Sequence, residues 1–431
     1  MTTMWQGTAA RISSWAGRKY LARVQRKGFN LARLPERALV TLRRDGLDPV
    51  PELGALRDRE PVSKLPLPFV GGAWLVTGHA EAKRVLVDSK SFSNDFTNLV
   101  GSAGITEAQT PGGLGFADPP DHTRLRRLLT PEFTMRRLAR LTPRIHAIVE
   151  ERLDALAAEA EHTGRPVDLV QDFALPIPSL VICELLGVPY AEREEFQRLS
   201  AARFDLAGGA TASFGAVTES LDYFRGIVKQ QRTEPGDGLL GQLIRDHGDQ
   251  IGDDELAGLA DGVLTGGFET TASMLALGAL LLLRDPALPE RLAADEAFAD
   301  RFVEEALRHL TVVQTAFPRF AREDVEVGGV RIAQGDIVVC SLSAADRDPA
   351  LGPRMDEFDP ERPAAAGHLA FGHGIHRCVG AELARMELRA AYPALARRFP
   401  RMRIAVPAEE LRFRKLSIVY GLDELPVRLG S

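Results

Sequence analysis

Residues 371–380 (FGHGIHRCVG) place a cysteine inside a glycine-rich run. Three glycines within nine positions are useful only where a turn needs a positive φ or where a ligand approaches the backbone closely. A helix is expected to begin near Val379, and its N–H groups and positive end would favour a thiolate at Cys378. Two other interpretations stay open: a zinc cluster of Cys378 with His373 and His376, which lacks an evident fourth ligand, or a buried structural cysteine.

A second motif, GGFETT at residues 266–271, lies within a helical pattern that runs from about Asp254 to Arg284. Each glycine in a helix interior costs roughly 1 kcal/mol relative to alanine, and threonine can bond back to carbonyls of the preceding turn. We therefore expect a distorted helix in which the acid Glu269 directly precedes the hydroxyl of Thr270. The alternative is a glycine pair that packs against another helix, and Phe268 could face either a substrate pocket or the core.

Two further patterns are ambiguous, because the chain holds 46 arginines and only seven lysines. An exposed Glu-x-x-Arg pair on a helix contributes only about 0.2–0.5 kcal/mol. The chain contains five such pairs: Glu81/Arg84, Glu195/Arg198, Glu305/Arg308, Glu382/Arg385 and Glu409/Arg412. Residues 118–127 (DPPDHTRLRR) predict a helix start with Asp118 as a possible cap and with His122 and Arg126 on one face. Alone, these patterns indicate solvated surfaces.

The elements that must position these residues are mainly helices. Helical periodicity dominates from about residue 118 to 310, and strand patterns occur at residues 74–77 and 337–340 and in a hairpin at 325–332 with Gly328-Gly329 as its turn. The tail from 413 to 429 resembles a β-ribbon. The apolar run 274–283 is too short for a membrane span and predicts a buried core helix. One large mixed domain fits this pattern better than several.

Composition narrows the class of protein. A formal charge of −6 over 431 residues makes a nucleic-acid binder improbable, and 45% hydrophobic residues allow a large core. Three cysteines (Cys183, Cys340, Cys378) do not form a disulfide framework and are typical of a reducing compartment. Residues 1–35 carry seven Arg or Lys and no acid, a composition that overlaps with transit peptides and membrane-surface helices but that we interpret as a solvated extension.

The pattern Phe371-Gly372-x-Gly374-x-His376-x-Cys378-x-Gly380 resembles the haem-binding signature of the cytochrome P450 family. The resemblance extends from about residue 46 to the C-terminus. It implies haem b (iron protoporphyrin IX) as cofactor and Cys378 as the axial ligand of the iron, since a Cys thiolate holds the haem in this family. It also implies further roles: cofactor contacts by Phe371, Gly372 and Gly380; propionate contacts by His122, Arg126, Arg319 and His376; oxygen activation and proton relay by Thr270 and Glu269; and a structural triad of Glu305, Arg308 and Arg362.

The implied fold is the cytochrome P450 fold, mainly α with small β-sheets, as a single haem domain over residues 46–431 after a basic extension at 1–45. The implied activity is a soluble, bacterial-type monooxygenase of secondary metabolism that hydroxylates or epoxidises an organic substrate with O2. A ferredoxin with its reductase, or a flavodoxin-type donor, would supply electrons, docking on a basic patch formed by some of five arginines (Arg124, Arg127, Arg136, Arg137, Arg377). We expect a cytoplasmic monomer without a transmembrane segment.

Three alternatives remain at this stage: a peroxide-driven peroxygenase, an oxidative-coupling enzyme, and a haem-binding sensor or carrier without turnover. The Glu269-Thr270 pair argues for reductive oxygen activation. The pocket is expected to be lined by residues 92–116, 199–214, 264–268, 311–317 and 417–420, which hold few charges and favour a fairly large, mostly apolar ligand.

Overall fold

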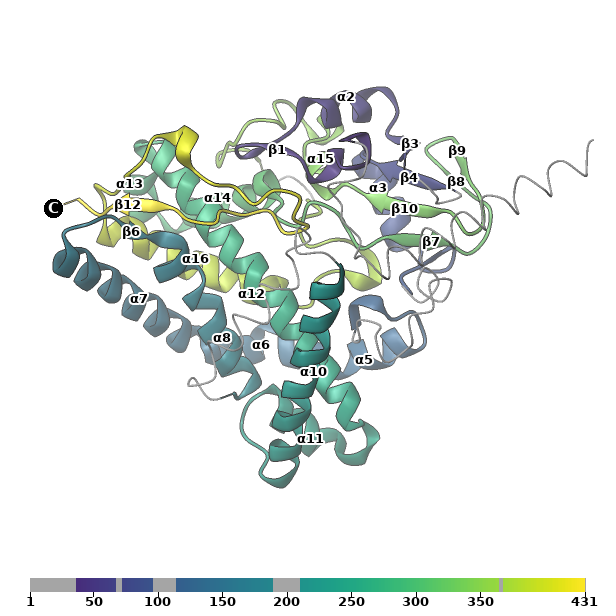
Figure 1. The fold of residues 1–431 in the computed structure, drawn as a ribbon, viewed down its shortest axis with the longest axis horizontal. Helices are drawn as coiled ribbons and strands as arrows, with labels where there is room; N and C mark the ends of the chain where they lie inside the picture. The colour runs from purple at the N-terminus through teal and green to yellow at the C-terminus, as the bar shows by residue number, and fades with distance from the viewer. Residues whose placement is uncertain (1–35, 67–71, 96–113, 189–209, 364–366, 431) are drawn as a thin grey trace, which may run out of the picture.

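The computed structural model describes residues 36–66, 72–95, 114–188, 210–363 and 367–430. Its longest helix, α12 (Asp253–Arg284), crosses the middle of the molecule, and other helices pack around it (Figure 1). The helices are α2 (Pro51–Arg59), α3 (His79–Val87), α5 (Asp121–Leu129), α6 (Met135–Leu138), α7 (Thr142–Thr163), α8 (Pro176–Leu186), α10 (Ala210–Thr233), α11 (Leu239–His247), α12, α13 (Ala287–Ala294), α14 (Glu296–Leu310), α15 (Leu342–Ala345) and α16 (Ala381–Arg398), with short 3-10 and π turns between them.

The strands form small separate sheets, with the main sheet and the hairpin β8–β9 on one side of the helices and the sheet that contains β6 and β12 on the opposite side (Figure 1). They are β1 (Arg44–Asp45), β2 (Asp48–Pro49), β3 (Val62–Lys64), β4 (Ala73–Val76), β5 (Phe92–Ser93), β6 (Val167–Asp168), β7 (Arg319–Ala321), β8 (Val325–Val327), β9 (Val330–Ile332), β10 (Ile337–Cys340), β11 (Arg403–Ile404) and β12 (Pro426–Arg428). The main sheet has the order β3-β4-β10-β7-β5, in which only β4 and β10 are parallel. A second sheet, β11-β12-β6, joins the C-terminal tail to the segment after α7.

The predicted hairpin is confirmed, because β8 and β9 pair in antiparallel register around Gly328 and Gly329. Both glycines have positive φ, at 57° and 75°, which side-chain-bearing residues seldom adopt. The strands expected near residues 74–77 and 337–340 are β4 and β10, with Cys340 opposite Val76. The tail forms a ribbon only in part, through β12 and isolated bridges such as Phe413 with Leu422.

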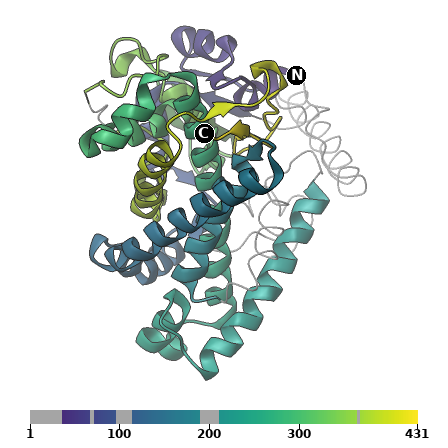
Figure 2. The same cartoon turned by 90° about the vertical axis from the view of Figure 1, so that its left-hand side faces the viewer.

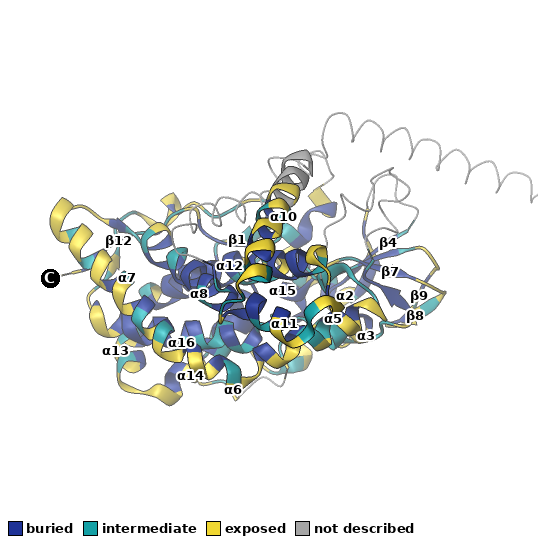
Figure 3. Ribbon diagram, turned by 90° about the horizontal axis from the view of Figure 1, so that it is seen from below, coloured by how far each residue is buried: buried dark blue, intermediate teal, exposed yellow. Residues whose placement is uncertain are grey.

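The core surrounds α12, whose residues 271–282 are all buried, so the prediction of a buried core helix at 274–283 is confirmed in substance. Figure 3 shows this segregation, with buried positions on the inner helices and exposed positions on the outward faces of α7 and α10. α12 is long and apolar enough to cross a membrane, but 78% of its most apolar window is buried within the protein, as in the core helix of a globular domain. The described residues form one domain.

The N-terminal boundary expected at residue 45 stays a prediction, since residues 1–35 lie outside the described part of the chain. Residues just before that boundary already contact the core. Arg44 is half-buried and donates from Nε to Gln314 Oε1 at 3.0 Å and from Nη2 to the carbonyl of Thr311 at 2.9 Å. Burial lowers the pKa of Arg44 to about 9. Figure 2 shows α10 along one side of the molecule, apart from this region.

Candidate active site

Residues 371–380, here called the cysteine loop, lead into α16. The backbone N–H of Cys378 donates to the carbonyl of Phe371 at 2.9 Å and closes the loop. Gly372 and Gly374 have φ of 67° and 73°, and a Cβ at Gly374 would overlap the backbone of Leu86. Gly380 differs, because a Cβ there would meet only ordinary contacts, including Cys378 Sγ at 4.0 Å. Backbone conformation therefore requires glycine at the first two positions only.

Cys378 is the exposed cysteine, whereas Cys183 and Cys340 are buried. Although Cys378 is accessible to solvent, the protein atoms around its thiol remove part of its hydration and raise its pKa. A backbone hydrogen bond from Gly380 and the charge of Arg126 oppose that rise. A thiolate here consequently needs a further cation, such as a bound metal ion. Among the described residues, no group of three or more His, Cys, Asp or Glu side chains is arranged to hold a metal ion, so the zinc cluster is not formed.

Four basic side chains from three segments gather near the cysteine loop. His122 and Arg126 lie on α5, Arg319 on β7, and His376 in the loop itself. The rings of His122 and His376 are 4.2 Å apart between centroids. Burial, then the charges of Arg319 and His122, lower the pKa of His376 to about 3. Burial and the charge of Arg126 likewise lower the pKa of His122, and burial lowers that of Arg319.

His122 is buried, and neither of its ring nitrogens makes a hydrogen bond of normal geometry with a described residue, although the Ile375 backbone opposes the fall in the pKa of the ring. A buried polar group without a good hydrogen bond is destabilising by roughly 1–3 kcal/mol. The guanidinium groups of Arg126 and Arg319 carry positive charge, which an anion would stabilise. The group of His122, Arg126, Arg319 and His376 thus fits a ligand that carries carboxylates, next to an exposed cysteine that can bind a metal.

The expected cap at Asp118 is not formed, because α5 begins at Asp121 with Pro120 as its N-cap residue. Asp118 instead joins two strands to the start of α5. Its carboxylate accepts from Ser93 Oγ at 2.5 Å and from the Asn94 backbone at 2.8 Å, and it pairs with Arg322 after β7. These bonds lower the pKa of Asp118 despite its partial burial. Sequence reasoning missed this role, which fixes the position of His122.

The Gly266-Gly267 pair lies in the middle of α12. The expected distortion does not interrupt the helix, although Thr270 Oγ1 donates to the carbonyl of Gly266 at 2.7 Å, the predicted back-bond. The two glycines differ in their surroundings: a Cβ at Gly267 would press on Ile182 of α8 at 3.1 Å, whereas a Cβ at Gly266 would meet nothing within 4 Å. Helix packing accounts for Gly267, and open space lies beside Gly266. Phe268 belongs to the core.

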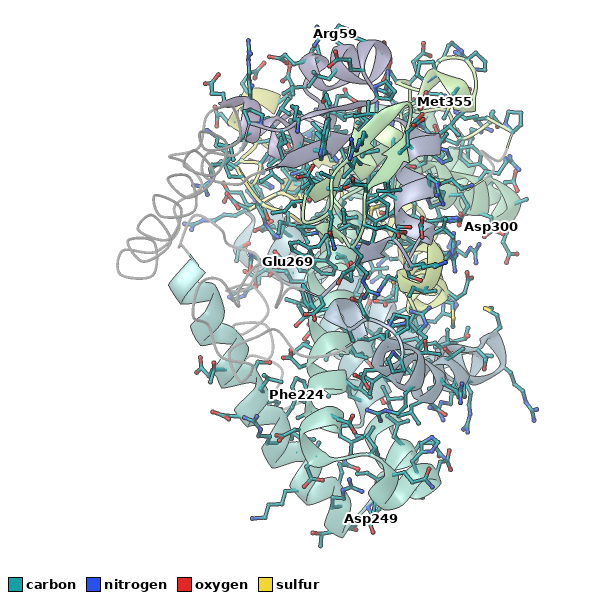
Figure 4. All side chains as sticks on the ribbon, turned by 90° about the vertical axis from the view of Figure 1, so that its right-hand side faces the viewer. Arg59, Phe224, Asp249, Glu269, Asp300 and Met355 are labelled. Atoms are coloured by element: carbon teal, nitrogen blue, oxygen red, sulfur yellow. The ribbon has the colours of Figure 1, made fainter. Side chains whose placement is uncertain are left out.

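Glu269 is buried near the centre of the molecule (Figure 4). Its Oε1 accepts a hydrogen bond from Arg414 Nη1 in an ion pair. Arg414 was not among the predicted site residues. No local signal could have identified it, since it lies 145 residues away in an arginine-rich chain.

Glu305, Arg308 and Arg362 come together as predicted. Arg308 binds Glu305 with two hydrogen bonds, from Nε at 2.8 Å and from Nη2 at 2.7 Å, and Arg362 Nε lies 3.4 Å from the same carboxylate. Arg308 and Arg362 also donate to backbone carbonyls of residues 346–357. The triad therefore joins α14 to the segment that precedes the cysteine loop.

The arginines expected to form a basic patch are not equivalent. Arg124 pairs with Glu255 of α12, and Arg137 lies 3.5 Å from the carboxylate of Glu132. Arg127, Arg136 and Arg377 are exposed and have no ion pair with another described residue.

Comparison with known proteins identifies the family of the chain. The family model described as "Cytochrome P450" matches residues 72–232 and 217–403. The chain is 43% identical over 391 residues to "Cytochrome P450 FAS1" of Rhodococcoides fascians, covering 89% of this chain and 96% of that protein. It is 39% identical over 386 residues to "Mycinamicin IV hydroxylase/epoxidase" of Micromonospora griseorubida, with 89% and 96% covered. Among solved structures, OxyC, a cytochrome P450 implicated in an oxidative C-C coupling reaction during vancomycin biosynthesis, aligns with a TM-score of 0.80 at 39% identity, over 90% of this chain and 96% of that one.

The chain belongs to the cytochrome P450 family. It has the fold of that family and is an oxidoreductase with haem b as cofactor. The ring of His122, which makes no good hydrogen bond with the described residues, and the basic groups beside Cys378 fit this cofactor, which has two carboxylates and an iron that accepts a thiolate.

Proposed function

We propose that this protein is a monooxygenase that inserts one oxygen atom of O2 into an organic substrate, and that Cys378 is the residue that would bind the haem iron. The observation that carries the proposal is the arrangement around the cysteine loop: an exposed cysteine, a buried histidine whose ring nitrogens make no good hydrogen bond with the described residues, and three further basic side chains, two of them arginines. When bound, thiolate-ligated haem supplies the chemistry of oxygen activation.

In this proposal, His122, Arg126, Arg319 and His376 hold the propionates. Arg319 is fixed for this task, because its Nη1 donates to the carbonyl of Phe317 at 2.8 Å and the side chain is buried. His122 is oriented by α5, whose first turn Asp118 holds in place through the carbonyl that accepts from the His122 backbone at 2.9 Å. Phe371 packs beside the loop with Arg385 over its ring at 4.7 Å, and Gly372 and Gly380 complete the loop backbone.

Glu269 and Thr270 would move protons. The Thr270 hydroxyl donates a hydrogen bond to the carbonyl of Gly266, so its oxygen remains able to accept a hydrogen bond from a neighbouring donor. Glu269 would take a proton from solvent and release it from its carboxyl group, while the Thr270 hydroxyl would orient the proton donor and keep its own hydrogen. An acid next to a hydroxyl in the central helix supports reductive oxygen activation over a peroxide-driven reaction and over a carrier without turnover.

A test uses purified protein with NADPH, ferredoxin reductase and ferredoxin. We expect a red-shifted Soret band in the reduced carbon monoxide complex and substrate-dependent NADPH oxidation that yields a product heavier by one oxygen atom. Cys378→Ser should lose the red shift, while Cys340→Ser, at a buried strand position, should keep it. Turnover with peroxide alone would favour a peroxygenase, and haem binding without any turnover would favour a carrier.

Oxidative coupling is the second candidate, because OxyC, which is implicated in such a reaction, is as similar in sequence to this chain as the mycinamicin enzyme. The same assay separates the two, since coupling removes two hydrogen atoms from the substrate and adds no oxygen. A product lighter by two hydrogens would establish coupling.

The electron donor is proposed to be an acidic ferredoxin or a flavodoxin-type protein that docks at Arg127, Arg136 and Arg377. Their lack of ion pairs in the described structure leaves their charge available to a partner, whereas Arg124 is neutralised by Glu255. Reversing Arg127 and Arg136 to Glu should slow reduction at low salt by about tenfold or more. Arg331→Glu, on the hairpin β8–β9, is the control. Unchanged reduction rates would refute the docking surface.

The substrate is proposed to be mostly apolar and fairly large. Of the expected lining segments, residues 96–113 and 199–209 lie outside the described residues, as do the side chains of 210–214. In the described part, Phe116 contacts Phe317 with ring centroids 4.5 Å apart, and Val313 bridges to Val419. The polar Gln314 is occupied, since its Nε2 donates to the carbonyl of Ser417 at 2.7 Å. Apolar compounds should therefore induce the spin-state shift of the haem, and binding of small anions alone would contradict this.

A further inference from the structure

We propose that Arg414 is a positioning residue that holds the Glu269 carboxylate away from Thr270 and controls when Glu269 passes on a proton. This inference rests on the proposed role of Glu269 and Thr270 in the monooxygenase reaction. It adds Arg414, a residue of the C-terminal tail, to the proposed machinery. It also adds an exchange in which Arg414 pairs either with Glu269 or with Asp423.

The position of Arg414 is built into the fold. It lies on a short antiparallel segment, residues 413–422, here called the tail hairpin. The backbone N–H of Arg414 donates to the carbonyl of Gly421 at 2.9 Å, and the rings of Phe413 and Tyr420 stack at 5.7 Å. A Cβ at Gly421 would lie 2.7 Å from Ser273 Oγ, one helical turn after Glu269. The hairpin thus packs directly on α12 and places the guanidinium at a fixed site beside the acid.

The ion pair determines which way Glu269 faces. Successive residues on an α-helix point about 100° apart, so adjacent side chains do not face each other. In this structure Glu269 is bonded to Arg414, and Thr270 is bonded to the carbonyl of Gly266. Proton delivery from Glu269 to the side of Thr270 consequently requires the carboxyl group to leave Arg414 and turn, or a water molecule to bridge the two side chains.

Asp423 provides an alternative partner for the guanidinium. Its Oδ1 lies 3.9 Å from Arg414 Nε, whereas Glu269 pairs with Nη1, and the Asp423 side chain is 55% exposed, against 20% for Arg414. Arg414 therefore spans from a buried carboxylate to an exposed one. When Glu269 takes a proton from solvent its charge is lost, Arg414 then favours Asp423, and the neutral carboxyl is free to turn. After passing on the proton, Glu269 is again a carboxylate and pairs with Arg414.

The tail hairpin also contacts the segment that follows α14. Tyr420 N donates to the carbonyl of Val312 at 2.8 Å, and Gln314 N donates to the carbonyl of Ile418 at 3.0 Å. Residues 311–317 and 417–420 are proposed to line the substrate pocket. Substrate binding and the position of Arg414 thus depend on the same short hairpin, which gives proton delivery a means to respond to an occupied pocket.

Among the described charged groups, Arg414 pairs with Glu269 from the tail, and Asp423 lies next to Arg414. On α12 itself, the nearest acid on the N-terminal side is Asp261, two turns earlier, which accepts a hydrogen bond from Ser220 Oγ of α10 at 2.5 Å. Removing Arg414 therefore removes the cation of the described ion pair with Glu269. Opposite charges at such separations shift a titration midpoint by about 1–3 pH units.

The experiment compares Arg414→Gln, Arg414→Lys and Asp423→Asn in the haem-loaded protein. The first readout is the infrared band of protonated Glu269, assigned by its loss in Glu269→Gln and followed against pH. The second is the pH profile of coupling, the product formed per NADPH consumed. Arg412→Gln is the matched control, because Arg412 directly precedes the tail hairpin but pairs with the exposed Glu424 at 2.8 Å.

In Arg414→Gln, we expect the infrared midpoint to rise by about one pH unit or more and the pH profile of coupling to move with it. Arg414→Lys should restore most of both, and Asp423→Asn should lower coupling without changing the haem spectrum. An unchanged midpoint in Arg414→Gln, or an equal change in Arg412→Gln, would overturn the proposal. A shifted midpoint with an unmoved coupling profile would also overturn it, because the ion pair would then be structural only. The infrared titration needs no turnover, so failure of the proposed monooxygenase activity is recognised separately.

Discussion

Replacing Glu305 with Gln should destabilise the folded protein by about 3–5 kcal/mol. Glu305 is 6% exposed and Arg308 is 1% exposed, so the guanidinium has almost no access to water if its partner loses its charge. The Glu305 carboxylate accepts two hydrogen bonds from Arg308 and one from the backbone N–H of Asp359 at 3.0 Å. Gln keeps the shape of Glu but offers one acceptor oxygen in place of two, and it leaves a buried positive charge uncompensated.

The same acid-to-arginine spacing occurs on the surface and provides the control. Asp222 and Arg225 lie three positions apart on α10 at 2.6 Å, with side chains 65% and 47% exposed. Exposed pairs contribute about 0–1 kcal/mol, so Asp222→Asn should change stability little. Urea unfolding of the haem-loaded protein, followed by circular dichroism, measures both variants. If Glu305→Gln costs no more than Asp222→Asn, the argument that burial makes this pair structural is wrong.

Three further predictions follow from glycines and from a buried acid. Gly278→Ala should destabilise the protein by about 1–3 kcal/mol, because its Cβ would overlap the hydroxyl of the buried Tyr392. Its control is Gly226→Ala on α10, where a Cβ would meet nothing within 4 Å and should stabilise the protein by up to about 1 kcal/mol. Urea unfolding measures both variants. Gly374→Ala should reduce haem retention on gel filtration, since residue 374 needs positive φ and has no room for a Cβ. Burial raises the pKa of Glu387 well above its ordinary value, so its contribution to stability is complete below about pH 4 and falls as pH rises toward the folded pKa. Glu387→Gln should make stability less dependent on pH in that window, and an unchanged slope in urea titrations across pH would contradict this.

Local patterns predicted those parts of the fold whose partners are near in sequence. The Gly328-Gly329 turn determines its own hairpin, and the spacing of Glu305 and Arg308 makes a helical pair geometrically possible. The pattern could not say which of five Glu-x-x-Arg pairs is buried, because burial depends on packing against distant segments. The distortion expected at Gly266-Gly267 does not break the helix, because α12 is continuous from Asp253 to Arg284. Gly267 instead serves helix packing, since Ile182 of α8 lies against it.

The ion pair between Arg414 and Glu269 and the contacts of Arg44 were beyond sequence reasoning for a related reason. Each of these arginines contacts a residue more than 100 positions away in the sequence. In an arginine-rich chain, no local pattern distinguishes them from the other arginines. Asp118 illustrates the same limit at shorter range. Its position before a Pro-Pro pair predicted a helix cap, but its carboxylate is used by Ser93, Asn94 and Arg322, which only the meeting of β5 and β7 brings near.

Three buried glutamates show how the fold gives one side chain type different tasks. Glu305 is surrounded by donors from one helix and the following segment, so its role is to hold backbone in place. Glu387 has an oxygen without a hydrogen-bond partner in the described protein, and burial raises its pKa well above the ordinary value. Glu269 lies between these cases, because its described cation comes from a short hairpin and has an exposed alternative partner in Asp423. A carboxyl group that must gain and lose a proton repeatedly needs a partner that can be exchanged, and of the three only Glu269 has such a partner among the described contacts.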